Sequence, residues 1–151
     1  MTSESLRLEP ASVDDAPLFT AMDQLGDTGD FILAGGREAH AQALAAGEPI
    51  YLRIVADDAV AGYFVLAPDP DGRSVECRRI VVTERGRGIG QGAIPLMEDH
   101  CRRALGRSRV WLDVFDDNAR ARHVYEKLGY VRCGETEYSG RRALVYEKEL
   151  G

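Results

Sequence analysis

Glycine occupies every second position in a short segment that follows the strand-like run ending at Val82. Two arginines flank the first of its glycines, so that the segment contains Arg85, Gly86, Arg87, Gly88, Gly90 and Gly92. Glycines leave the backbone accessible, and the start of a helix directs unpaired N–H groups and the positive end of its dipole at an anion. This spacing favours a phosphate or pyrophosphate site. The plainer alternative is a turn that only lets a helix and a strand pack closely.

Two nucleotide-binding patterns can be compared with this segment. The pattern GxxxxGK[ST] is absent, because no Lys-Ser or Lys-Thr pair follows a glycine. The dinucleotide pattern GxGxxG/A is formally present at Gly88, Gly90 and Ala93, with Asp113 and Asp116 about 20 residues further on. However, the first glycine lies well beyond the strand, and only one of the two βαβ halves that a dinucleotide needs is predicted. A nucleotide-binding oxidoreductase is therefore the less favoured alternative.

A third pattern fits better. RxxGxG is present at 85–90, and NxxAxxxYExxGY follows it downstream, beginning at Asn118 and including Tyr125. Two motifs in this order and at this separation resemble those of the GNAT acyltransferases, the Gcn5-related N-acetyltransferase superfamily. The order of predicted elements from Leu6 to Leu150 also follows that of the family. The resemblance therefore covers essentially the whole chain.

The resemblance implies acetyl-CoA as cosubstrate. In the family, backbone amides of the glycine-rich turn bind the pyrophosphate of acetyl-CoA. The resemblance therefore implies that the pyrophosphate-binding residues here are Arg85, Gly86, Arg87, Gly88, Ile89 and Gly90. The preceding strand pairs with the pantetheine arm through its backbone, at Ile80, Val81 and Val82. Asn118 either hydrogen-bonds the pantetheine or caps its own helix, since Asn is a favoured N-cap.

Acyl transfer from a thioester to an amine requires a neutral amine, stabilisation of an oxyanion and protonation of the departing thiolate. Tyr125 occupies the position of the family's general acid, and a phenol with a pKa near ~10 stays protonated at neutral pH. The alternative role for Tyr125 is packing alone.

Glu76 resembles the glutamate that removes the amine proton in several family members. Strand alternation places Glu76 on the same side as Arg78, Ile80 and Val82. An ion pair with a neighbouring arginine is the alternative role, and Asp113 is a second acidic candidate. No cysteine stands beside a histidine as an activated nucleophile would require, so direct transfer in a ternary complex is expected.

The elements that must position these residues follow from periodicity and turn residues. We expect strands at 6–11, 50–55, 60–66, 74–82, 109–115, 130–138 and 142–150, and helices from Ser12 through Met22, at 37–46, at 88–105 and at 118–128. A loop is expected at 26–36. The predicted fold class is α+β (mixed α/β): a single central, mostly antiparallel, twisted sheet of about seven strands flanked by about four helices, as in the GNAT fold.

Composition sets the remaining expectations. The 151 residues are predicted to form a single N-acetyltransferase domain, 1–151. A net charge of -6 disfavours nucleic-acid binding and suits a cationic substrate. No apolar run is long enough to span a membrane, and no signal-peptide pattern is present, so cytoplasmic localisation is expected. Cys77, Cys101 and Cys133 lack metal spacing and are expected to be buried, reduced thiols, with no metal site.

The sequence leaves the acceptor open. An amine on a small molecule or on a peptide is equally allowed. The resemblance also implies homodimers as a common form. A non-catalytic acyl-CoA-binding or regulatory domain is the alternative to an enzyme, and the joint presence of Tyr125 and Glu76 favours the enzyme.

Overall fold

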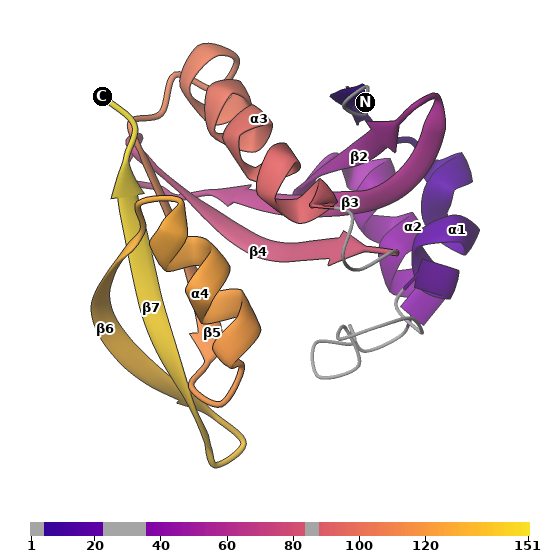
Figure 1. Cartoon of the computed structure of the whole chain (residues 1–151). Helices are drawn as coiled ribbons and strands as arrows, with labels where there is room; N and C mark the ends of the chain where they lie inside the picture. Colours follow the sequence, from indigo (N-terminus) through magenta and orange to yellow (C-terminus); the bar gives the residue numbers. More distant parts are fainter. Residues whose placement is uncertain (1–4, 23–35, 84–87) are drawn as a thin grey trace. The chain divides into compact units, whose positions relative to one another are not determined.

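The computed structural model describes residues 5–22, 36–83 and 88–151 (Figure 1). Its elements follow the predicted order: β1 (Leu6–Pro10), a 3-10 turn (Val13–Asp15), α1 (Ala16–Met22), α2 (Gly36–Ala46), β2 (Ile50–Ala56), β3 (Ala59–Pro68), β4 (Ser74–Val82), α3 (Ile89–Arg103), β5 (Arg109–Phe115), α4 (Ala119–Lys127), β6 (Val131–Tyr138) and β7 (Arg141–Glu149). Most of the loop predicted at 26–36 lies outside the described residues.

The strands form a seven-stranded sheet with the order β1-β2-β3-β4-β5-β7-β6. Antiparallel pairing joins β1 to β2, β2 to β3, β5 to β7 and β6 to β7, whereas β4 and β5 pair in parallel. The mostly antiparallel sheet that the sequence predicts is therefore confirmed.

The chain divides into two compact units. The N-terminal unit comprises residues 1–67 and 79–97, and the C-terminal unit comprises residues 68–78 and 98–151. Strand β4 and helix α3 each contribute residues to both units.

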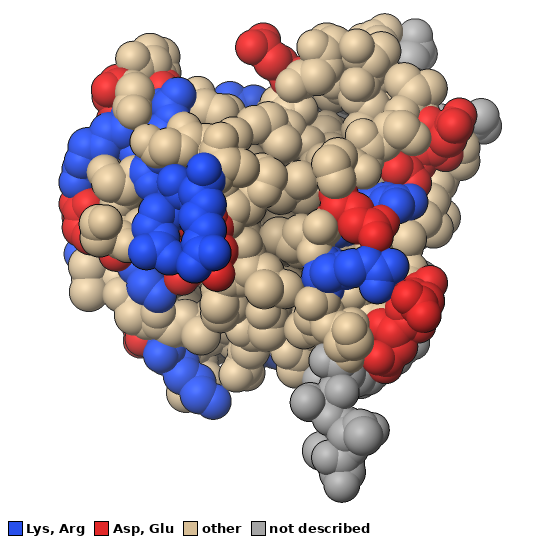
Figure 2. Space-filling model, turned by 90° about the horizontal axis from the view of Figure 1, so that it is seen from above, with Lys and Arg blue, Asp and Glu red and all other residues tan. Residues whose placement is uncertain are grey.

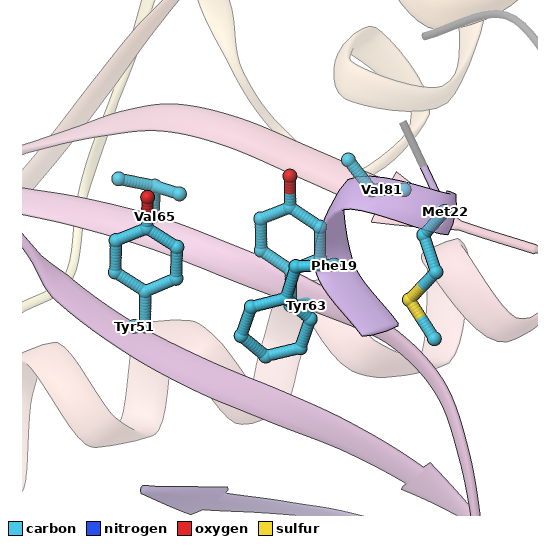
Figure 3. Packing of buried hydrophobic residues seen from close by; sticks show 6 residues of the cluster. All are labelled: Phe19, Met22, Tyr51, Tyr63, Val65 and Val81. Atoms are coloured by element: carbon cyan, nitrogen blue, oxygen red, sulfur yellow. The ribbon is translucent and has the colours of Figure 1, made fainter. Parts of the chain in front are cut away.

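An aromatic cluster forms part of the core of the N-terminal unit (Figure 3). Phe19 of α1 is fully buried and stacks on Tyr63 of β3, with ring centroids 4.2 Å apart. Tyr51 of β2 stacks on the same phenylalanine, and its hydroxyl lies 2.8 Å from Nδ1 of the buried His40. Fully burying a side chain of this size contributes about 1.5–3 kcal/mol. The cluster therefore fixes α1 and α2 against β2 and β3.

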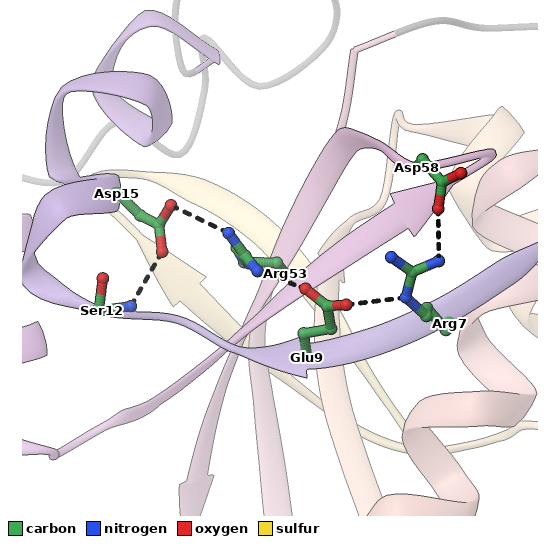
Figure 4. Close-up of polar contacts among 6 residues, drawn as sticks. All are labelled: Arg7, Glu9, Ser12, Asp15, Arg53 and Asp58. Atoms are coloured by element: carbon green, nitrogen blue, oxygen red, sulfur yellow. Dashed lines mark hydrogen bonds and ion pairs between the residues drawn. The ribbon is translucent and has the colours of Figure 1, made fainter.

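Ion pairs link β1, the start of the first helix and β2 (Figure 4). The Arg7 guanidinium donates to Glu9 at 2.7 Å, and Arg53 of β2 donates to the same carboxylate. Arg53 also pairs with Asp15 at 3.7 Å. The Asp15 carboxylate accepts the backbone N–H of Ser12 at 2.9 Å, which is the capping contact expected of this Ser-Val-Asp-Asp sequence.

Gly62 of β3 allows a close backbone approach by the end of β4. A Cβ added at Gly62 would lie 1.9 Å from the carbonyl oxygen of Val81 and 3.2 Å from Cα of Val82. One residue further on, the backbone N–H of Thr83 donates to the Ala61 carbonyl at 2.9 Å. The absence of a side chain at Gly62 thus allows the end of β4 to approach β3 this closely.

We expect Gly62→Ala to destabilise the protein by about 3 kcal/mol or more, because the atom that the new Cβ meets belongs to the backbone and cannot rotate away. Denaturant unfolding followed by circular dichroism measures the change. The matched control is Gly134→Ala in β6, whose added Cβ would lie 3.9 Å from Cβ of Val145, an ordinary contact. This control should change stability by about 0.5 kcal/mol at most. Equal stability of the two variants would contradict the close approach.

In the C-terminal unit, one face of β5 and β7 is buried. Alternate residues of these strands are 3 % exposed or less, namely Val110, Leu112, Val114, Leu144 and Tyr146. Helix α4 is tied to this sheet by the Tyr146 hydroxyl, which donates to Glu126 at 2.6 Å. Gly129 ends the helix with φ +96, as the sequence predicts, and the last hairpin turns at Ser139 and Gly140, both with positive φ.

Charged side chains are mixed on the surface. Acidic and basic residues stand next to one another at several places on the face shown in Figure 2. Exposed ion pairs of this kind include Arg102 with Asp99, at 3.2 Å. Among the residues that the structure describes, no helix is long and apolar enough to cross a membrane.

Candidate active site

The described part of the glycine-rich turn begins at Gly88. Its φ of +71 is a conformation that favours glycine, and no atom lies within 4 Å of where a Cβ would stand. Helix α3 starts at the next residue, the buried Ile89, and the Gly88 carbonyl accepts the N–H of Gly92 at 3.0 Å. An accessible backbone at the start of a helix fits an anion, as the sequence predicts. The predicted ligands Arg85, Gly86 and Arg87 lie outside the described residues.

Strand β4 leads into this turn and has one buried face. Val81 is 1 % exposed, whereas Ile80 and Val82 are half-buried on the other face. A Cβ added at Gly90 would lie 3.9 Å from the Val82 side chain, so the first turn of α3 packs on the end of β4. The three strand residues predicted to face pantetheine therefore directly precede the turn.

Asn118 is the N-cap of α4. Its side-chain oxygen accepts the backbone N–H of Ala121 at 3.2 Å. Of the two roles that the sequence allows, the structure shows the cap. The side-chain amide still offers N–H donors to a ligand.

Tyr125 lies half-buried on α4 between two anchored tyrosines. Its ring centroid is 5.9 Å from that of Tyr130 and 6.4 Å from that of Tyr146. The Tyr130 hydroxyl donates to Glu98 at 2.8 Å, and the Tyr146 hydroxyl donates to Glu126. Both neighbours are thus held by carboxylates, and they restrict the Tyr125 ring.

The Tyr125 hydroxyl differs from its neighbours in its hydrogen bonding. Within residues 5–22, 36–83 and 88–151, it makes no hydrogen bond. Burial raises the pKa of Tyr125 well above its ordinary value, and electrostatic interaction with Cys77 and Asp113 raises this pKa further. The phenol is therefore protonated at neutral pH and has a proton that no described residue accepts.

Glu76 forms the ion pair that the sequence allows as its alternative role. Nε of Arg78 donates to its carboxylate at 3.0 Å, and the Glu76 side chain is 20 % exposed against 54 % for Arg78. The other neighbouring arginine, Arg79, is buried and donates to the Tyr63 hydroxyl at 3.3 Å. Glu76 therefore keeps a partly accessible carboxylate beside one exposed arginine.

Tyr138 at the end of β6 was missed by sequence reasoning. Its hydroxyl donates to the carboxylate of Asp113. This bond, then burial, then the charges of Asp113 and Glu76 raise the pKa of Tyr138 to about 12. Its ring meets Phe115 edge-on at 6.3 Å, and the Arg141 guanidinium lies 3.6 Å from the centroid of the same phenylalanine. Glu76 and Asp113 thus act on one exposed phenol.

The candidate acid and base belong to different groups of side chains. Adjacent residues of a strand point to opposite faces of the sheet, and Glu76 and Cys77 of β4 therefore lie on opposite faces. Cys77 acts electrostatically on Tyr125, whereas Glu76 acts on Tyr138. Asp113 acts on both phenols. The two acidic candidates therefore lie together, and Asp113 is the one that also influences the candidate acid.

The burial of the cysteines agrees only in part with the sequence-based prediction. Cys77 and Cys101 are buried, but Cys133 is exposed, so the prediction of three buried thiols is wrong at Cys133. Cys133 lies in β6, an edge strand of the sheet whose residues are all exposed, which explains the exposure. Burial, followed by the charge of Glu98, raises the pKa of Cys101 to about 12, so this thiol is not an activated nucleophile. The described residues hold no group of three or more metal-binding side chains.

Comparisons with known proteins bear on this arrangement. The spermine/spermidine N(1)-acetyltransferase of Bacillus subtilis is 27% identical over 71 residues, 46% of this chain and 47% of that protein. The streptothricin acetyltransferase of Streptomyces lavendulae is 29% identical over 86 residues, 56% of this chain and 45% of that protein. The chain thus spans about half the length of the curated relatives it matches.

Solved structures match the chain over nearly its whole length. A dodecameric spermidine N-acetyltransferase from Vibrio cholerae has a TM-score of 0.77 at 16% identity, covering 96% of this chain and 94% of that one. The protein yncA from Salmonella typhimurium, solved with acetyl-CoA as its cofactor, has a TM-score of 0.78 at 16% identity, covering 99% of this chain and 95% of that one. These likenesses show the fold. A model of the acetyltransferase (GNAT) family matches residues 20–130, which is more than half of the chain, and the chain therefore belongs to that family.

Proposed function

We propose that the chain is an acetyl-CoA-dependent N-acetyltransferase that transfers an acetyl group to a primary amine by direct attack in a ternary complex. The observation that carries the proposal is the Tyr125 hydroxyl. It is protonated, restricted by two anchored rings and without a hydrogen-bond partner in the described part of the chain. A tyrosine that only packed would need no such hydroxyl, whereas a general acid does.

The cofactor-binding residues we propose are Ile80, Val81, Val82, the turn 85–90 and Asn118. The open backbone at Gly88 and the helix start behind it fit a pyrophosphate, because a Cβ there would stand in the space that the anion needs. Acetyl-CoA supplies the thioester. The backbone N–H groups of the turn hold the phosphates, and those at the end of β4 orient the arm that carries the acetyl group.

The reaction then needs one proton removed and one supplied. We propose Glu76 as the base that takes the amine proton, with Asp113 as the second candidate. The amine nitrogen bonds to the acetyl carbon, and the carbon–sulfur bond breaks as the electron pair leaves on sulfur. Tyr125 gives its proton to that thiolate. No covalent acyl-enzyme forms, because Cys77 and Cys101 are buried thiols.

For the acceptor we propose a primary amine on a polycationic small molecule. The net charge of -6 and the adjacent carboxylates of Glu76 and Asp113 would favour such a substrate. The polyamine and streptothricin acetyltransferases among the relatives support the same class. A peptide amine is the second candidate.

A CoA-release screen across amine classes tests the proposal. Purified protein with acetyl-CoA should release CoA thiol with a polyamine or a basic antibiotic, more slowly with lysine peptides, and not without an amine. Binding of acetyl-CoA without turnover on any amine would contradict enzymatic function and favour a regulatory acyl-CoA-binding domain. Saturable binding of NADH would instead favour the dinucleotide interpretation of the glycines.

We further propose that residues 1–151 work as one N-acetyltransferase domain in the cytoplasm. The proposed cofactor-binding and proton-transfer residues are spread over residues 76–125, and the reaction needs both sets. Cys77, Cys101 and Cys133 form no disulfide in the described part of the chain, which supports a reducing compartment.

A further inference from the structure

Helix α4, which carries Tyr125, has no buried side chain of its own. The structure describes all nine residues of this helix, and none of them is buried. In most proteins an apolar face packed on the core holds a helix in place. Polar contacts at particular atoms therefore contribute much of what fixes α4. Strand β7, drawn beside α4 in Figure 1, supplies two of these contacts through Tyr146 and Lys148.

The end of α4 places Tyr125 next to Tyr130. The backbone N–H of Tyr130 turns back and donates to the Tyr125 carbonyl at 3.0 Å, and the N–H of Gly129 donates to the Glu126 carbonyl at 3.1 Å. These two bonds form a Schellman motif, in which the residues joined by the longer bond also pack on each other. The ring centroids of Tyr125 and Tyr130 are 5.9 Å apart, as this motif requires. The position of Tyr125 therefore depends on how the end of α4 is fixed.

Lys148 of β7 binds the end of α4. Its ammonium donates to the Leu128 carbonyl at 2.8 Å and to the carboxylate of Glu98 in α3 at 3.0 Å. The ammonium also lies 5.7 Å from the centroid of the Tyr130 ring. A Cβ added at Gly129 would lie 3.6 Å from Cε of Lys148, so the lysine side chain passes close to this glycine. One ammonium thus ties the end of α4 to α3.

Charge and burial strengthen this tie. The side chains of Lys148 and Glu98 are 29% and 12% exposed, so water screens their attraction less than it screens an exposed pair. A cation at the C-terminal end of a helix also interacts favourably with the helix dipole. Without the ammonium, Glu98 would lose its counter-charge in a largely buried position, which is unfavourable. Loss of Lys148 is therefore expected to shift the end of α4.

We propose that Lys148 is a positioning residue for acetyl transfer. By holding the Leu128 carbonyl and Glu98 together, it fixes the end of α4 and thereby the place of the Tyr125 hydroxyl. The proposal rests on the general-acid role proposed above for Tyr125. The variant Tyr130→Phe would keep the bond from Lys148 to Leu128, so the tie does not depend on the Tyr130 hydroxyl.

A double-mutant cycle between Lys148 and Tyr125 tests the proposal. Lys148→Met should lower kcat about tenfold, because a small displacement of a reacting group is enough for such a loss. The dissociation constant of acetyl-CoA should change by less than about threefold. In a Tyr125→Phe background the same substitution should lower kcat by less than about twofold, because the hydroxyl that it misplaces is gone. A residue that only stabilises the fold would lower kcat by the same factor in both backgrounds.

Arg109→Met is the matched control. Arg109 also pairs with a carboxylate of β7, donating to Glu147 at 2.7 Å, and its side chain is 22% exposed. Glu147 directly precedes Lys148 in β7 and therefore lies on the other face of the sheet. The control removes the same charge and should lower stability in denaturant unfolding to a similar extent as Lys148→Met. It should leave kcat close to that of the wild type.

Two further variants keep the test decisive. Lys148→Arg keeps the charge and the N–H donors and should recover part of the kcat that Lys148→Met loses. Lys148→Gln keeps an N–H donor for the Leu128 carbonyl and takes the place of Lys148→Met in the cycle if that variant does not fold.

The outcomes separate this inference from the proposed function. A loss of kcat that requires the Tyr125 hydroxyl and is partly recovered in Lys148→Arg supports the positioning role. An unchanged kcat in Lys148→Met, an equal loss in both backgrounds or no recovery in Lys148→Arg overturns it, while a low kcat in Tyr125→Phe alone leaves the general acid in place. If Tyr125→Phe alone leaves kcat unchanged, the general acid and the positioning role both fail.

Discussion

Replacing Tyr125 with phenylalanine is expected to lower kcat by about 10²-fold or more, because the departing thiolate then leaves without a proton donor. The ring stays in place between Tyr130 and Tyr146, so the dissociation constant of acetyl-CoA should change by less than about threefold, a shift below roughly 1 kcal/mol. Steady-state kinetics and calorimetric titration measure the two quantities on the same preparation.

The matched control is Tyr130→Phe. It removes the same hydroxyl from the same helix region, but that hydroxyl donates to Glu98 and has no proton to give. Tyr130→Phe should therefore lower stability and leave kcat within a few-fold of wild type. If Tyr125→Phe lost binding and turnover equally, Tyr125 would be a structural residue.

The raised pKa of Tyr125 also predicts how the reaction rate depends on pH. Because burial favours the neutral phenol, the protonated acid persists to a higher pH than an ordinary tyrosine with a pKa near ~10. The rate at saturating substrates should therefore show no alkaline fall attributable to this group up to about pH 10. A fall centred near pH 8 that disappears in Tyr125→Phe would contradict the assignment.

Loss of the general base is the second large effect. Glu76→Gln is expected to lower kcat/KM by about 10²-fold at neutral pH, since most of the amine is protonated and its proton has no acceptor. The deficit should shrink as the pH approaches the amine pKa of about 10, where the neutral amine becomes abundant. Rates measured from pH 6 to pH 10 with a saturating acetyl-CoA concentration give the comparison.

Asp113→Asn is the parallel variant, because Asp113 and Glu76 act on the same phenol of Tyr138. The variant with the larger loss at neutral pH identifies the base. Asp99→Asn removes an exposed carboxylate paired with Arg102 and serves as the control for net charge. Losses below about threefold in both active-site variants would exclude a carboxylate base, because general base catalysis contributes far more.

Local sequence features predicted the elements well. Strand β4 was expected at 74–82 and has those bounds, since its alternation and the Asp-Gly turn before it are readable from neighbouring residues. The cap at Asn118 and the Ser-Gly turn of the last hairpin are local in the same sense. Each depends on the backbone preference of one or two residues, and this preference follows directly from the residue types.

Contacts between distant strands were not predictable. The hydrogen bond from Tyr138 to Asp113 joins residues 25 apart in the chain, and it depends on β7 lying between β5 and β6. The approach of Gly62 to Val81 likewise depends on the placement of β4 beside β3. Alternation assigns a residue to a face but does not determine which strand becomes its neighbour. For this reason Glu76 could be named as a candidate from the sequence, whereas its grouping with Asp113 and Tyr138 could not be predicted.

Direct transfer of the acetyl group is tested most directly by a single turnover with acetyl-CoA that carries an isotopic label in the acetyl group. The label should pass to the amine in one kinetic phase, with one CoA thiol released for each acetylated amine. The intact mass of the protein should stay unchanged throughout. A labelled protein, acetylated at Cys77 and able to acetylate the amine after acetyl-CoA is removed, would contradict direct attack, and CoA release without any acetylated amine would contradict N-acetyltransferase function.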